Sequence, residues 1–195
     1  MKQEMNDQQR LQLIESMIIK ARNDYNESGT LYLMWGFVIL FCSLTQFTAH
    51  YFFNMNMGYI WMLTWVAAIV QVLILRKEKR KSKRTTYTDE IIGYIWLCFF
   101  FCMMLTFFIM LYAKAYPVLL PAILVLYGVP TFLSGVILRF QPLKYGGLIC
   151  WALAISSVLT PVQFQILYIA AAVLIAWIVP GIYLRKKYKK ETNDQ

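Results

Sequence analysis

Long apolar stretches without a charged residue alternate along the chain with short segments rich in Lys, Arg, Asp and Glu. The uncharged stretches are residues 28–75, 91–113, 115–138 and 145–184. A helix needs about 20 apolar residues to cross the hydrocarbon core of a bilayer. The first and last stretches are therefore long enough for two such helices each, and the middle two for one each. The pattern predicts an all-α, polytopic membrane protein, a bundle of six transmembrane helices. The spans are expected at about residues 31–53, 58–75, 91–113, 118–139, 145–160 and 161–184.

Ahead of the first span, residues 6–27 have the pattern of an amphipathic helix. Leu11, Ile14, Ile18, Ala21 and Tyr25 recur at spacings of three and four, and polar residues fill the other face. Such a segment is expected to lie at the membrane interface rather than to cross the bilayer. We therefore predict three regions: a cytoplasmic amphipathic helix (1–29), a six-helix transmembrane domain (30–184) and a basic cytoplasmic tail (185–195).

The composition agrees with a membrane protein. Hydrophobic residues make up 59% of the chain and charged residues only 15%, whereas a soluble domain carries about 25% charged residues. The formal net charge is +9. Of the 19 basic residues, 18 fall on one side of the predicted threading, and Lys114 alone falls on the other. Because Lys and Arg are enriched in cytoplasmic segments, both termini are expected in the cytoplasm. No nucleic-acid recognition motif accompanies the charge, so no nucleic-acid partner is expected.

The spans lack the residues that membrane enzymes use for chemistry. No acidic residue lies in any of them, and the sequence contains one histidine, His50. At 1.5 Å per residue, His50 lies about 28 Å from the cytoplasmic face, and Ser134 about 7 Å from it. A serine nucleophile and its base must approach to about 3 Å, so this pair is excluded as a dyad. The sequence predicts no enzyme, no metal site and no cofactor.

Uncharged polar residues gather in the half of the spans that faces away from the cytoplasm. Hydroxyl and amide groups can line a pocket for an uncharged solute, and they can equally join helices through hydrogen bonds. Both interpretations stay open. The candidate pocket residues are Thr45, Gln46, His50, Thr64, Thr106, Ser156 and Ser157.

Basic clusters directly follow the second and the sixth predicted span. Clusters of this kind attract anionic lipid at about 1 kcal/mol per basic residue near the surface. They also orient a membrane protein, and they could bind an acidic partner. The candidate lipid contacts are Arg76, Lys77, Lys79, Arg80, Lys81, Arg185, Lys186 and Lys187.

Two segments, 29–43 and 127–151, resemble uncharacterised small six-span integral membrane proteins of bacteria. The resemblance implies a multi-pass protein of the bacterial inner membrane and brings no activity with it. The function expected from the residues is non-catalytic: binding of a protein partner or of membrane lipid, as an accessory subunit or a homo-oligomer. The alternative is a small transporter or channel for an uncharged or amphipathic solute.

Overall fold

The computed structural model describes residues 29–55, 57–81 and 87–193, and every regular element within them is helical. An all-helical fold is what the uncharged stretches predict, because a helix satisfies its own backbone hydrogen bonds in lipid. The amphipathic helix predicted at 6–27 lies outside the described residues. The helices are α2 (Thr30–Phe53), η1 (Gly58–Met62), α3 (Leu63–Lys81), α4 (Tyr87–Tyr112), α5 (Tyr116–Ile137), α6 (Gln141–Val158), α7 (Val162–Val173), η2 (Leu174–Ile178) and α8 (Val179–Asn193).

Five helical stretches in the described part are long and apolar enough to cross a membrane. They are Thr30–Phe53, Gly58–Lys77, Glu90–Tyr112, Tyr116–Ile137 and Val162–Lys186. The remaining predicted span corresponds to α6, whose 18 residues include Gln141 and Lys144 near the start of the helix. The protein is therefore an all-α molecule with five candidate membrane-spanning helices.

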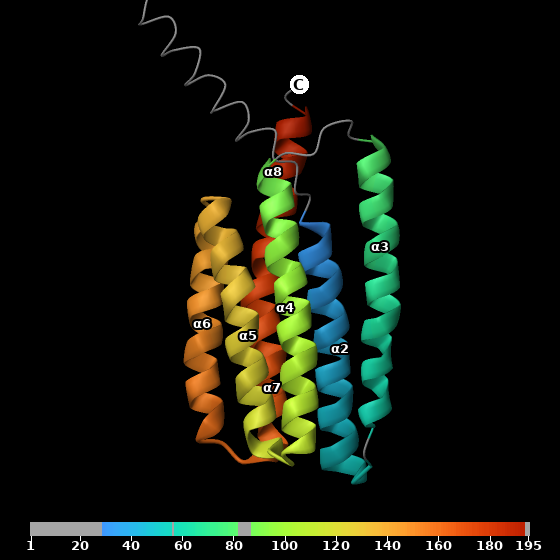
Figure 1. The fold of residues 1–195 in the computed structure, drawn as a ribbon, viewed down its shortest axis with the longest axis vertical. Helices are drawn as coiled ribbons and strands as arrows, with labels where there is room; N and C mark the ends of the chain where they lie inside the picture. The colour runs from blue at the N-terminus through green and yellow to red at the C-terminus, as the bar shows by residue number, and fades with distance from the viewer. Residues whose placement is uncertain (1–28, 56, 82–86, 194–195) are drawn as a thin grey trace, which may run out of the picture.

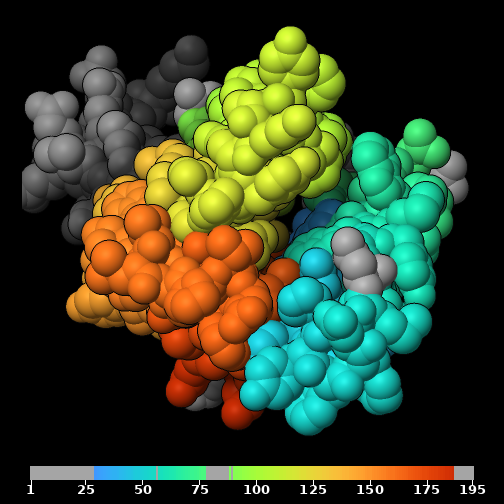
Figure 2. All heavy atoms as spheres, turned by 90° about the horizontal axis from the view of Figure 1, so that it is seen from below, coloured from blue at the N-terminus to red at the C-terminus, as the bar shows by residue number. Residues whose placement is uncertain are grey.

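Successive long helices run up and down the bundle (Figure 1). The closest pairs are α5 with α6, α2 with α7, and α4 with α5. By contrast, α3 stands at the edge and packs on α2 and η1. Seen from the end that carries Lys114, the surface is hollowed between α4 and the α2–α3 pair (Figure 2). The bundle thus has a dense centre of α2, α5, α6 and α7, with α3 at its periphery.

The buried core lies where these four central helices meet. Helices α3 and α4 add little to it: among their described residues, only Ala67 and Ile92 are buried. The other buried apolar residues include Tyr32, Ile39, Cys42, Leu124, Tyr127, Leu143, Cys150, Ala154, Ile169, Val173 and Trp177.

Glycines allow the central helices to approach closely. A Cβ placed on Gly147 of α6 would lie 2.6 Å from Cβ of Phe132 and 2.9 Å from the carbonyl oxygen of Gly128, both on α5. A Cβ on Gly146 would lie 2.8 Å from Cα of Ala176 in η2. Contacts this short leave no room for a methyl group. Small residues at these positions permit the backbone approach typical of packed membrane helices.

Helices α4 and α5 end in the same backbone motif. At the α5–α6 turn, the amide of Arg139 donates to the carbonyl of Val136 (3.1 Å). The amide of Phe140 donates to the carbonyl of Gly135 (2.9 Å). Arg139 takes a left-handed conformation, with φ of 50°. This is the Schellman pattern, which satisfies the last carbonyls of a helix. Lys114 has φ of 54° and occupies the equivalent position after α4.

The last long helix contains a π-helical segment, η2, before Pro180. The amide of Val179 donates to the carbonyl of Leu174, five residues back. Pro180 has no amide hydrogen to donate and its ring crowds the carbonyl of Ala176. A wide turn ahead of the proline accommodates that clash. The helix then continues through Pro180 and Gly181 as α8.

Two helices extend beyond their predicted ends. The second span was expected to stop at residue 75, but α3 continues to Lys81. The last span was expected to stop at 184, but α8 continues to Asn193. Lys, Arg and Glu are good helix formers, so a basic segment can prolong a helix into water. The predicted border between the transmembrane domain and the basic tail, at 184/185, therefore falls inside α8.

Candidate functional site

The structure places two of the candidate pocket residues around Trp61 of η1. The indole Nε1 of Trp61 donates to Oε1 of Gln46 on α2, and the hydroxyl of Thr64 donates to the backbone carbonyl of Trp61 (2.6 Å). Gln46 and Thr64 are both half-buried. These hydrogen bonds hold the α2–η1 connection together at the end of the bundle that carries Lys114.

A second group lies at the α6–α7 turn. The hydroxyl of Ser156 donates to the carbonyl of Ala152 (3.0 Å), and that of Ser157 donates to the carbonyl of Ala154 (2.8 Å). The buried amide of Gln165 donates from Nε2 to the carbonyls of Ser157 (3.2 Å) and Thr160 (3.3 Å). Gln165 therefore ties the start of α7 to the end of α6, and Ser156 and Ser157 bond within their own helix.

The remaining candidates are Thr45, Thr106 and His50. Thr45 and Thr106 are half-buried, on α2 and α4, and His50 is exposed near the end of α2. The described hydrogen bonds thus divide the predicted layer into an α2–η1 group and an α6–α7 group. Each group joins neighbouring segments of the chain.

The structure also assembles an aromatic cluster that the sequence reasoning missed. Trp177 of η2 lies with its ring centre 4.8 Å from that of Tyr127 and 5.8 Å from that of Trp96. Trp96 contacts Tyr32 (5.9 Å) and Phe99 (5.5 Å), edge to face. Edge-to-face and offset rings are favourable arrangements. The five residues come from α2, α4, α5 and η2. Only Trp96 and Phe99, three residues apart on α4, are linked by their spacing, so no sequence pattern indicated the cluster as a whole.

Polar groups continue this cluster into the core of α5. The indole Nε1 of Trp177 donates to Oγ1 of Thr131 (2.9 Å), which in turn donates to the carbonyl of Tyr127 (2.7 Å). The hydroxyl of Ser134, three residues further along α5, is fully buried and has no hydrogen-bond partner in the described part of the chain. The Trp177–Thr131 bond fixes η2 against α5.

Apart from Lys114, the described basic side chains near the ends of the spans gather at one end of the bundle. Arg76 and Lys77 lie near the end of α3, and Arg185 and Lys186 lie on α8; all four are exposed. Lys79, Arg80 and Lys81 continue α3, and Lys187 continues α8. The ends of α3 and α8 lie at the same end of the bundle (Figure 1).

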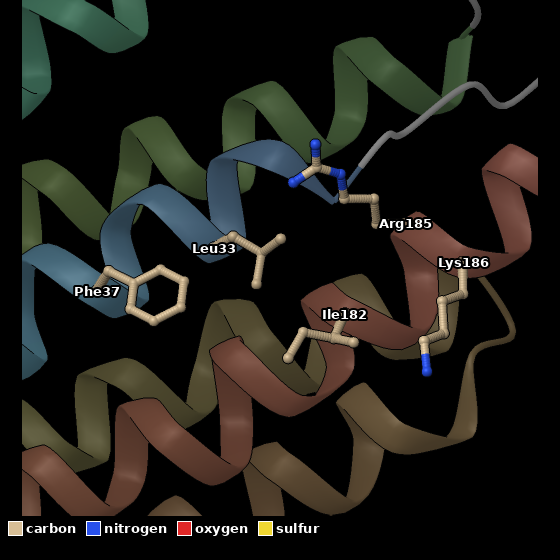
Figure 3. A pocket seen from close by; sticks show the side chains of 5 residues that line it. All are labelled: Leu33, Phe37, Ile182, Arg185 and Lys186. Atoms are coloured by element: carbon tan, nitrogen blue, oxygen red, sulfur yellow. The ribbon is translucent and has the colours of Figure 1, made fainter.

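Two of these cations border a groove between α2 and α8. It has a volume of about 470 Å³ and is lined by Leu33, Phe37, Ile182, Arg185 and Lys186. Leu33 is buried, whereas Phe37 and Ile182 are exposed. Figure 3 shows Arg185 and Lys186 toward one end of α8, with the three apolar side chains further along the groove. Of the candidate lipid contacts, the structure brings Arg185 and Lys186 together here and leaves Arg76 and Lys77 on α3.

The four cysteines are present as free thiols. Cys42 and Cys150 are buried in the core. Cys98 and Cys102 lie one turn apart on α4; Cys98 is exposed and Cys102 is half-buried. Within the described residues, no three His, Cys, Asp or Glu side chains form a group that could hold a metal ion. The groove between α2 and α8, by contrast, combines a concave surface with charged groups.

No protein-family model, curated protein or solved structure matches this chain.

Proposed function

We propose that this chain is a six-span, non-enzymatic protein of the bacterial inner membrane that acts by binding anionic lipid or a protein partner at its cytoplasmic face, as an accessory subunit. The observation that carries the proposal is the gathering of exposed cations at one end of the bundle, beside apolar helix surface. Anionic headgroups and acidic proteins are the partners that such a surface attracts.

Chain connectivity supports the sixth span. Helix α5 ends at the basic end of the bundle, and α7 begins at the opposite end (Figure 1). The segment between them, α6, runs beside α5 and has 18 residues, so it is about 27 Å long at 1.5 Å per residue. This length approaches the hydrocarbon thickness of about 30 Å. A protein in which both neighbours cross the membrane needs α6 to cross as well.

A non-catalytic role is supported by where the two obvious reactive groups lie. His50 is exposed near the end of α2, toward the Lys114 end of the bundle. Ser134 is buried in the last turn of α5, at the basic end. The two side chains lie too far apart for proton transfer between them.

The orientation can be tested with reporter fusions. Fusions after Tyr87 and Tyr188 are expected to read as cytoplasmic, and fusions at Met57, Lys114 and Thr160 as external. The physical reason is the asymmetry of Lys and Arg around the spans. The Thr160 fusion tests α6 directly, because a five-span chain in which α6 does not cross would put residues 87 and 160 on the same side.

Anionic lipid is expected to stabilise the protein. The full chain would be reconstituted in vesicles of phosphatidylcholine with an increasing fraction of phosphatidylglycerol, and its melting temperature measured. A ligand of the native state raises the melting temperature, by about 2–4 °C per kcal/mol for a chain of this length. The rise should shrink in 1 M salt, where the screening length is about 3 Å. An unchanged melting temperature across the lipid series would refute lipid binding and leave the protein partner as the remaining form of the proposal.

One observation favours the alternative of a small transporter. The hollow between α4 and the α2–α3 pair opens at the Lys114 end (Figure 2). Transport through it predicts that proteoliposomes containing the protein swell faster than empty ones in an uncharged solute such as glycerol. Equal swelling rates would remove this alternative.

A further inference from the structure

The groove between α2 and α8 lies beside a close approach of α2 to η2 and α8, which two glycines permit. A Cβ on Gly36 would lie 2.6 Å from Cγ1 of Ile178, and one on Gly181 would lie 3.0 Å from Cγ of Leu33. Beside this close contact, Leu33 and Phe37 project from one face of α2, four residues apart. Ile182 and Lys186 project from α8 with the same spacing. The groove therefore has apolar side chains on both walls.

The groove lies near the ends of the helices, at the depth expected for the headgroup side of one membrane leaflet. Phe37 lies seven residues into α2, so it is about 10 Å from the start of that helix at 1.5 Å per residue. Arg185 and Lys186 lie near the same end of the bundle, directly beyond Ile182. A molecule that filled the groove would have an apolar part beside Phe37 and a polar part beside the two cations. With a volume of about 470 Å³, the groove has the size of a small-molecule site.

The two cations give the mouth of the groove an affinity for phosphate. Arg185 presents a planar fork of donors that can hold two oxygens of a phosphodiester, whereas Lys186 acts as a mobile point charge. Their side chains diverge from α8 (Figure 3), so Arg185 is the main contact and Lys186 adds attraction from the side. Neither forms an ion pair with a described residue.

We infer that this groove is a discrete site for one anionic phospholipid of the cytoplasmic leaflet. The phosphate binds Arg185 and is attracted by Lys186, and the first part of an acyl chain lies along Leu33, Phe37 and Ile182. The inference rests on the proposed function and makes it specific, because it replaces a diffuse attraction to the membrane surface with a single bound lipid molecule.

The test is native mass spectrometry of the full chain in detergent, titrated with phosphatidylglycerol, phosphatidylcholine or glycerol 3-phosphate. We expect one phosphatidylglycerol to bind about tenfold or more tightly than phosphatidylcholine, and glycerol 3-phosphate alone to bind weakly, because it lacks the acyl contacts. The variant R185Q/K186Q should lose that preference, since each lost basic contact near the surface weakens binding about fivefold. The matched control R76Q/K77Q removes the same charge from α3 and should change the affinity by less than about threefold.

A second variant tests the apolar part without changing charge. Ile182→Trp fills the groove from a side chain that is already exposed, so the protein should still fold. The variant should weaken the binding of phosphatidylglycerol and leave the binding of glycerol 3-phosphate unchanged. Equal effects of R185Q/K186Q and R76Q/K77Q, or no effect of Ile182→Trp, would overturn the discrete site while leaving the proposed function standing. Binding of glycerol 3-phosphate as tight as that of the lipid would show a phosphate site instead. If phosphatidylglycerol also failed to stabilise the wild-type protein in vesicles, lipid binding as a whole would fall.

Discussion

Replacing Trp177 with alanine is expected to lower the free energy of unfolding by about 3 kcal/mol. Trp177 is 3% exposed, lies in contact with the rings of Tyr127 and Trp96, and donates a hydrogen bond to Thr131. Removing a buried tryptophan costs about 3–5 kcal/mol in soluble proteins. The lower end applies here, because separated helices in a membrane still bury the side chain in lipid and only the packing is lost. Titration of the purified protein with dodecyl sulfate, followed by far-UV circular dichroism, measures the change.

Two variants show which part of the Trp177 interaction matters. Trp65→Ala removes the same side chain from α3, where it is 58% exposed, and should change stability by less than about 0.5 kcal/mol. Trp177→Phe retains a ring but loses the donor to Thr131; interhelical hydrogen bonds in membranes average about 0.6 kcal/mol. If Trp65→Ala were as destabilising as Trp177→Ala, the aromatic cluster would have no special part in holding η2 against α5.

Gly147→Ala is expected to destabilise the protein by about 1–2 kcal/mol. The new methyl group would lie 2.8 Å from the backbone nitrogen of Phe132 and 2.9 Å from the carbonyl oxygen of Gly128. Backbone atoms cannot rotate away as a flexible side chain can, so α6 must move off α5. Overpacking of this kind costs about 1–3 kcal/mol, and the higher helix propensity of alanine recovers part of it.

Gly93→Ala is the matched control, because Gly93 is also helical but, apart from the nearby backbone of its own helix, no described atom lies within 4 Å of the added carbon. Both variants gain the same helix propensity, of about 1 kcal/mol. The difference between their unfolding free energies therefore reports only the contact between α5 and α6. Gly93→Ala should be neutral or stabilising, and equal stabilities for the two variants would contradict the close approach at Gly147.

The helical fold could be predicted from the sequence because lipid leaves a spanning chain few alternatives to a helix. The contacts between helices could not. The spans are apolar on nearly every side, so periodicity does not mark which face of α2 or α5 meets a neighbour. Helix ends were also missed at Lys81 and Asn193, because charge signals where a helix leaves the membrane and not where its hydrogen bonding stops.

The candidate site was predictable only in part. The sequence placed Gln46 and Ser157 in the same half of the spans. That placement does not say which helices are neighbours, and each residue bonds within its own part of the chain. The basic clusters were visible in the sequence. The groove was not, because Leu33 and Ile182 lie at opposite ends of the chain and meet only through the glycines at 36 and 181.

The order in which the chain is made has a consequence for α2. Its main partners, α7 and η2, begin at Val162 and Leu174, so they leave the ribosome only after α3, α4, α5 and α6 have been synthesised. Until then, the face of α2 that carries Gly36 lacks its close contact with Ile178 of η2. The last helix therefore completes the packing of this bundle. A chain that ends before Val162 would expose that face of α2 to lipid or to a protein that shields unfinished membrane helices.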